Sequence, residues 1–140
     1  MKPNELRIGN YYRAGLEIIG SREAKLNLMD NDRVIQLRIE HFQLFQNAPI
    51  IVEMINPIPL TEEWLVKFGF KKTGETKKEN PIFTYMGAEC KFQLEQIGDS
   101  FYLMANNSYS PSLKYVNKLQ NLYYALTETE LAVTAKNNVA

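Results

Sequence analysis

Residues 57–70 have the sequence PIPLTEEWLVKFGF, and this stretch decides the class of fold. Its two prolines cannot donate hydrogen bonds to a neighbouring strand, so they end the apolar run before them. Thr61 can cap a helix with its hydroxyl, and Gly69 can adopt the left-handed conformation that ends one. The stretch therefore predicts a short helix at 61–68 between two strand-rich regions, which is typical of an α+β fold.

Downstream of this helix, short alternating segments separated by glycines predict a β-meander over 70–105. Its expected joints lie at 74–81, 87–88 and 98–100, the last of which is the tightest turn. The sheet is thus expected to be built from consecutive strands.

The C-terminal region has helical periodicity from Ser112 to Leu126, with polar residues such as Asn117 on the opposite face. Ser110 suits a cap and Pro111 a first turn. We therefore expect an amphipathic helix packed on the sheet through residues that include Leu119, Leu122 and Leu126. Thr127 and Glu130 have the spacing of a capping box, which predicts a second, short helical piece.

Upstream, the first 56 residues favour an SH3-like curved β-sheet or small barrel. A bent strand over 6–12 would fill it with Leu6, Ile8 and Tyr12. Residues 25–29 and 34–39 flank a turn-forming cluster and predict a hairpin, and 50–55 predicts another strand. Residues 41–46 suit a helical turn or a strand.

The length of 140 residues is typical of a single domain, 1–140, and also allows lobes 1–56 and 57–140. Sixteen basic and sixteen acidic residues cancel, so no global field attracts a phosphate backbone. No apolar stretch approaches the length of a membrane span or signal peptide. The lone Cys90 cannot form an intrachain disulfide, and we expect a cytoplasmic protein.

Catalytic and metal-binding patterns are scarce in this sequence. Cys90 and His41 are the only Cys/His pair, whereas a structural zinc site needs four such ligands. Cys90 alternates with Phe92 and Leu94, which favours a buried structural thiol. No phosphate-binding glycine motif or nucleophile elbow occurs. The sequence therefore predicts a protein that is not an enzyme, without cofactor or metal.

Two kinds of binding remain open. Protein contact or self-association is favoured by the tyrosines of the C-terminal helix, because Tyr anchors many interfaces; the candidates are Tyr115, Tyr123 and Tyr124. Nucleic-acid binding is the alternative, through a barrel face and a lysine-bearing region. Its candidate residues are Tyr11, Tyr12, Arg13, Lys67, Lys71, Lys72, Lys77 and Lys78.

Three stretches, ELRIGNYY at 5–12, PIPLTEEWLVKFGF at 57–70 and YVNKLQNLYYALTETEL at 115–131, carry a family resemblance. They resemble an uncharacterised family of short proteins from prophages and other mobile elements of gut anaerobic bacteria. The family pattern has His where this chain has Asn117, which argues against a histidine-dependent activity. The resemblance implies an accessory protein of a mobile element, and it brings no catalytic residue with it. The leading expectation is therefore a non-enzymatic binding module that acts through protein contacts.

Overall fold

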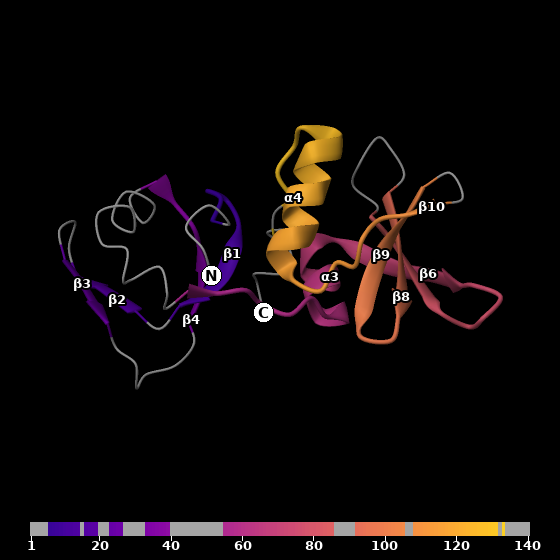
Figure 1. Cartoon of the computed structure of the whole chain (residues 1–140), viewed down its shortest axis with the longest axis horizontal. Helices are drawn as coiled ribbons and strands as arrows, with labels where there is room; N and C mark the ends of the chain where they lie inside the picture. The colour runs from indigo at the N-terminus through magenta and orange to yellow at the C-terminus, as the bar shows by residue number, and fades with distance from the viewer. Residues whose placement is uncertain are drawn as a thin grey trace. The chain divides into compact units, whose positions relative to one another are not determined.

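The computed structural model describes residues 6–14, 16–19, 23–26, 33–39, 55–85, 92–105, 108–131 and 133 (Figure 1). It combines helices with antiparallel sheets, which confirms the predicted α+β class. The chain divides into two compact units, Met1–Ile58 and Pro59–Ala140. This division lies two residues from the boundary at which the sequence allows two lobes, and the single-domain assignment stays a prediction.

The first unit contains two small antiparallel sheets. One has the strand order β4-β1-β5 and the other pairs β2 with β3. The strands are β1 (Tyr11–Ala14), β2 (Leu16–Ile19), β3 (Glu23–Leu26), β4 (Arg33–Gln36) and β5 (Ile55–Asn56). The described strands form no closed barrel, and the SH3-like detail stays a prediction.

The described residues of 25–29 and 34–39 do not form the predicted hairpin. β3 pairs with the preceding β2, and β4 pairs with β1, with Tyr12 opposite Ile35. Three residues separate β2 from β3, whereas six separate β3 from β4. Closing the shorter connection costs less chain entropy, so the nearer partner is favoured.

The start of the chain contains a turn where the sequence predicts a strand. Gly9 has a φ of 97°, which favours glycine, and the strand begins only at Tyr11. The amide of Gly9 donates to the carbonyl of Leu37 at 2.8 Å, and the amide of Leu37 donates to the carbonyl of Asn10 at 2.8 Å. Leu6 and Tyr12 are buried as expected, but Ile8 is exposed because it lies in this turn.

The second unit is built on a five-stranded antiparallel meander, as predicted. Its order is β10-β9-β8-β7-β6, so each strand pairs with its sequence neighbours. The strands are β6 (Phe70–Glu75), β7 (Pro81–Tyr85), β8 (Phe92–Ile97), β9 (Ser100–Ala105) and β10 (Ser108–Tyr109). The strand β6 extends further than predicted, through Glu75, which shortens the first loop to 76–80.

One face of this sheet is the core of the second unit. Phe83, Leu94 and Leu103 lie opposite one another on three adjacent strands and are all buried. Phe83 and Phe101 are in edge contact, with ring centroids 5.9 Å apart. Because side chains alternate along a strand, the neighbouring positions must point to the other face.

The helix α3 (Glu62–Phe68) confirms the helix predicted at 61–68. The hydroxyl of Thr61 accepts a hydrogen bond from the amide of Trp64 at 3.4 Å. Gly69 ends the helix with a φ of 101°, and its amide donates to Leu65 and Val66. Local chemistry therefore sets both ends of this helix.

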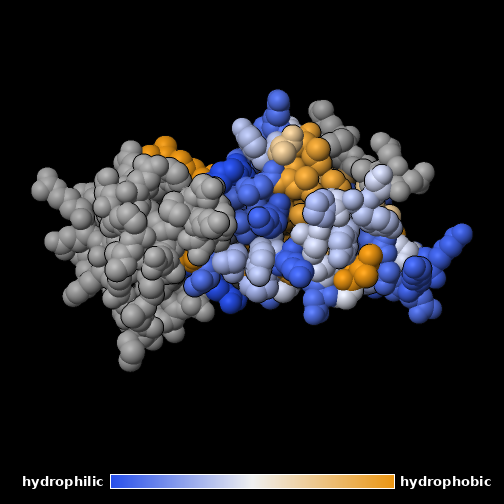
Figure 2. Space-filling model, viewed as in Figure 1, coloured by the Kyte–Doolittle hydropathy of each residue, from blue (hydrophilic) through white to orange (hydrophobic). Residues whose placement is uncertain are grey.

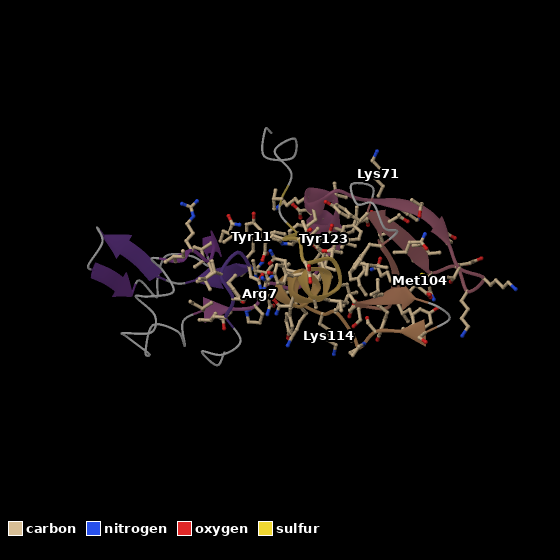
Figure 3. All side chains as sticks on the ribbon, turned by 90° about the horizontal axis from the view of Figure 1, so that it is seen from above. Arg7, Tyr11, Lys71, Met104, Lys114 and Tyr123 are labelled. Carbon is tan, nitrogen blue, oxygen red and sulfur yellow. The ribbon has the colours of Figure 1, made fainter. Side chains whose placement is uncertain are left out.

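The helix α4 (Val116–Thr127) packs on the core face of the sheet. The Tyr123 ring lies 5.4 Å from the Tyr85 ring and 5.2 Å from the Phe92 ring, both in edge contact. Figures 1 and 3 show both described helices on the same side of this sheet. The second unit is therefore a two-layer arrangement.

The predicted start of α4 is wrong. The N-cap is Tyr115, not Ser110, because the segment before the helix bonds to β9 instead. The hydroxyl of Ser110 accepts from the amide of Leu103 at 2.9 Å, and the amide of Leu113 donates to Phe101 at 2.8 Å. Residues 110–113 thus continue the sheet contacts of β10.

The buried face of α4 also differs from the periodicity prediction. Asn117 is buried, whereas Leu126 is 58% exposed. Residues 128–131 do not form the predicted second helical piece. Thr127 instead donates its hydroxyl to the carbonyl of Tyr123 at 2.8 Å, and Glu128 ends α4 with a φ of 58°. Thr127 therefore closes the long helix rather than capping a new one.

Candidate binding face of the C-terminal sheet

The face of the five-stranded sheet opposite α4, here called the open face, has no described helix over it (Figures 1 and 3). The strand register assigns its side chains. Ile82, Glu95 and Tyr102 lie opposite one another, out of phase with Phe83 and Leu94. The same alternation adds Lys71, Thr84, Gln93, Ile97, Met104 and Tyr109.

Glu95 is the centre of a hydrogen-bonded group on this face. It is only 4% exposed. Its Oε1 accepts from the hydroxyl of Tyr109 at 2.7 Å, and its Oε2 accepts from Nδ2 of Asn80 at 2.9 Å. Hydrogen bonds to an ionised carboxylate are stronger than neutral ones. The carboxylate therefore links β8 to β10 and to the loop between β6 and β7.

Tyr109 titrates abnormally because of this contact. Its hydrogen bond to Glu95 raises the pKa of the phenol above its usual value, and desolvation and the carboxylate charge act in the same direction. Its ring also meets the Tyr102 ring edge-on, with centroids 6.5 Å apart. Tyr109 nevertheless stays 54% exposed, so its ring is both positioned and accessible.

A second hydrogen-bonded group lies nearer β6. The hydroxyls of Thr73 and Thr84 are 2.8 Å apart, and Nε2 of Gln93 donates to the Thr84 hydroxyl at 3.1 Å. Lys71, which belongs to β6, points away from the sheet (Figure 3). The polar side chains in the middle of the open face are thus bonded to one another.

A hollow of about 420 Å³ lies at one end of the open face, and its volume falls within the range of ligand pockets. It is lined by Thr76, Lys77, Lys78, Asn80, Glu95, Ile97 and Tyr109. Ile97 is 43% exposed, and Figure 2 shows a small hydrophobic area among hydrophilic side chains over β8 and β9. The hollow therefore combines an aliphatic surface, an aromatic ring and two ammonium groups.

The loop 76–80 that supplies the lysines is held by its own backbone. The amide of Thr76 donates to the carbonyl of Asn80 at 2.9 Å, and the amide of Glu79 donates to the carbonyl of Thr76 at 2.8 Å. The Thr76 hydroxyl accepts from the amide of Asn80 at 3.2 Å. Lys77 and Lys78 are exposed and form no ion pair with any described residue. Their charges are available to a ligand.

The residues predicted to contact nucleic acid lie in both units. Tyr11, Tyr12 and Arg13 belong to β1, and the Tyr12 side chain is fully buried, so it cannot stack on a base. Lys67 lies 4.7 Å from the centre of the Trp64 ring and 3.9 Å from a Glu63 oxygen.

Three of the remaining lysines have exposed charges without such contacts. Lys72 lies 3.5 Å from a Glu75 oxygen, whereas Lys71, Lys77 and Lys78 have no comparable partner among the described residues. Only Lys77 and Lys78 line the hollow.

The three tyrosines predicted to contact a protein differ in exposure. Tyr123 is 3% exposed and belongs to the core, so a partner cannot reach it while α4 is in place. Tyr115, the N-cap of α4, and Tyr124, within the helix, are both exposed. Cys90 and His41 lie outside the described residues, so their expected structural roles stay predictions.

Five residues of the hollow were not among the sequence candidates: Thr76, Asn80, Glu95, Ile97 and Tyr109. Gln93 and Glu95 alternate with Phe92 and Leu94, a pattern that could have indicated a separate face of β8, but Gln96 and Ile97 break it. Tyr109 lies in a two-residue strand, too short to show a period.

No family model, curated protein or solved structure matches the chain, so the family resemblance stays a prediction. Among the described residues, no group of His, Cys, Asp and Glu could hold a metal ion. Nor does any helix in those parts of the chain have the length and apolarity needed to cross a membrane.

Proposed function

We propose that the protein is a non-enzymatic binding module that acts through protein contacts made by the open face. The observation that carries this proposal is the pairing of accessible and fixed groups at the hollow. Tyr109 and Ile97 are accessible, while Glu95 holds Tyr109 and Asn80 in place through part-buried hydrogen bonds. A surface that is already ordered loses less entropy on binding.

The proposed setting is a phage or other mobile element. This part of the proposal rests on the resemblance of 5–12, 57–70 and 115–131, stretches that also contribute residues to the core. Leu65, Phe68 and Leu119, for example, are fully buried.

A matched pair of substitutions tests the protein-contact proposal. Ile97→Ser removes an accessible aliphatic group from the hollow, whereas Leu126→Ser removes a similarly exposed one from the end of α4. Immobilised wild-type and variant proteins would be incubated with nuclease-treated lysate of the source organism, and retained proteins identified by mass spectrometry. We expect at least one protein to be retained by the wild type and by Leu126→Ser but lost with Ile97→Ser. Equal retention by all three forms would contradict the proposal.

Nucleic-acid binding is a second candidate because Lys77, Lys78 and Tyr109 share one hollow. Aromatic stacking together with phosphate contacts is how many proteins bind single strands. Filter binding with single- and double-stranded DNA and RNA at low salt tests it. Retention that decreases steeply with added salt would support this candidate, and no retention would remove it.

A further inference from the structure

The charges around the hollow are unevenly accessible. The Glu95 carboxylate is buried and both its oxygens already accept hydrogen bonds. Lys77 and Lys78 are exposed and lack a described ion-pair partner. Of the charged groups that line the hollow, the two ammonium groups are therefore the accessible ones. Charges at the rim of an interface select the partner and speed its approach.

The apolar part of the hollow sets a second requirement. Ile97 and Tyr109 are both more than two-fifths exposed, and they line the same hollow as the two lysines. A ligand that covers their apolar surface removes it from water, which favours binding. A ligand that satisfies the whole hollow thus carries an anionic group and an apolar group close together.

The charge balance favours a peptide over a nucleic acid as that ligand. A single strand needs a basic track along its backbone, but the chain has sixteen acidic and sixteen basic residues. Glu75 and Glu79, which are also exposed, flank the two lysines in the sequence. Two adjacent ammonium groups match one or two carboxylates better than a row of phosphates.

We infer that the hollow binds an acidic segment of a protein partner, with Asp or Glu side chains on Lys77 and Lys78 and an apolar side chain on Ile97 and Tyr109. This inference rests on the proposed function and specifies the chemistry of its partner. The ordered loop 76–80 presents the two lysines from a fixed backbone.

An array of short synthetic peptides tests the inference. Each peptide places an Asp or Glu pair near a Leu or Phe, and matched peptides carry Asn or Gln for the acids, or Ser for the apolar residue. We expect the full-length protein to bind peptides with both features and neither matched set. Backbone amide shifts in an NMR titration with the strongest peptide should be largest at 76–80, 95–97 and 109.

Charge reversal identifies the lysines responsible. For the strongest peptide, fluorescence anisotropy should give about tenfold weaker binding with Lys77→Glu/Lys78→Glu. Lys114→Glu/Lys118→Glu makes the same change in net charge at two exposed positions beside and within α4. This control should leave the dissociation constant within about twofold, because distant exposed charges are screened.

Three results would overturn the inference. These are equal binding of the Asn/Gln peptides, no binding of any peptide, and single-stranded oligonucleotide binding that disappears with Lys77→Glu/Lys78→Glu. The inference fails while the proposed function stands if Lys77→Glu/Lys78→Glu still retains a cellular protein that Ile97→Ser loses. Both fail if Ile97→Ser and Lys77→Glu/Lys78→Glu retain the same proteins as the wild type.

Discussion

At the scale of single residues, the bond between Tyr109 and Glu95 has a measurable consequence. Glu95→Gln removes the negative charge that the phenol faces. The pKa of Tyr109 should then fall towards about 10, the usual value for tyrosine. An NMR titration of ¹³C-labelled tyrosine checks this. Asp99→Asn, which removes an exposed carboxylate from the neighbouring hairpin turn, serves as the control and should leave the titration of Tyr109 unchanged.

The raised pKa of Tyr109 also makes the free energy of unfolding depend on pH. A tyrosine with a raised pKa in the folded state binds its proton more tightly there than in the unfolded chain. Its contribution is therefore complete below about pH 10 and is lost as the pH rises through the folded-state pKa. In wild type this loss should be visible in urea unfolding at alkaline pH, and Glu95→Gln should reduce it. Identical pH profiles for the two forms would contradict the assignment.

Gly74, in β6, and Gly98, in the turn between β8 and β9, allow a matched comparison of backbone effects on stability. A Cβ at Gly74 or at Gly98 would meet nothing within 4 Å, but only Gly98 has a positive φ, of 62°. Gly98→Ala should therefore destabilise by about 1 kcal/mol through backbone strain. Gly74→Ala should stabilise by about 0.5 kcal/mol because the unfolded chain loses freedom. Urea unfolding measures both, and effects of equal sign would contradict the backbone explanation.

At the scale of elements, α4 offers two leucines with opposite environments. Leu119 is fully buried, whereas Leu126 is 58% exposed. Leu119→Ala should destabilise by about 2–5 kcal/mol through the lost burial and the cavity. Leu126→Ala should change the free energy of unfolding by less than about 0.5 kcal/mol. Similar losses in thermal or urea unfolding would show that the helix face is assigned wrongly.

The two helices also show what could be predicted from the sequence. The bounds of α3 depend on Thr61 and Gly69, whose effects are local, so the prediction was confirmed. The start of α4 depends on bonds from Ser110 and Leu113 to β9. Those bonds join residues seven and twelve positions apart, beyond the span of one helical turn, so no helical pattern indicates them. Helical periodicity found the element and part of its buried face, including Leu119 and Tyr123, but not its first residue.

At the scale of the whole molecule, the second unit has a core of its own. We therefore expect residues 59–140, expressed alone, to fold cooperatively around Phe83, Leu94 and Tyr123. A dispersed amide NMR spectrum and a single unfolding transition would confirm this. A collapsed or aggregated fragment would show instead that the units share one core, which is the single-domain alternative.

The candidate site was less predictable than the fold. Glu95 bonds to Asn80 and Tyr109, which lie 15 and 14 residues away from it in the sequence. Only the meander brings them together, so composition and spacing could not reveal a buried carboxylate there. The lysines of the hollow were among the sequence candidates because exposed charge is visible in composition. Only the structure shows that Lys67 and Lys72, unlike these two lysines, have other contacts.

The outermost described strand on one side of the sheet, β6, bears on how the protein behaves in concentrated solution. Five of its six residues are exposed, and they include Lys71, Lys72 and Glu75. Lysines on the rim of a sheet oppose the addition of a strand from another molecule, because stacking like charges costs free energy. Fibre growth by templating along this rim is accordingly disfavoured.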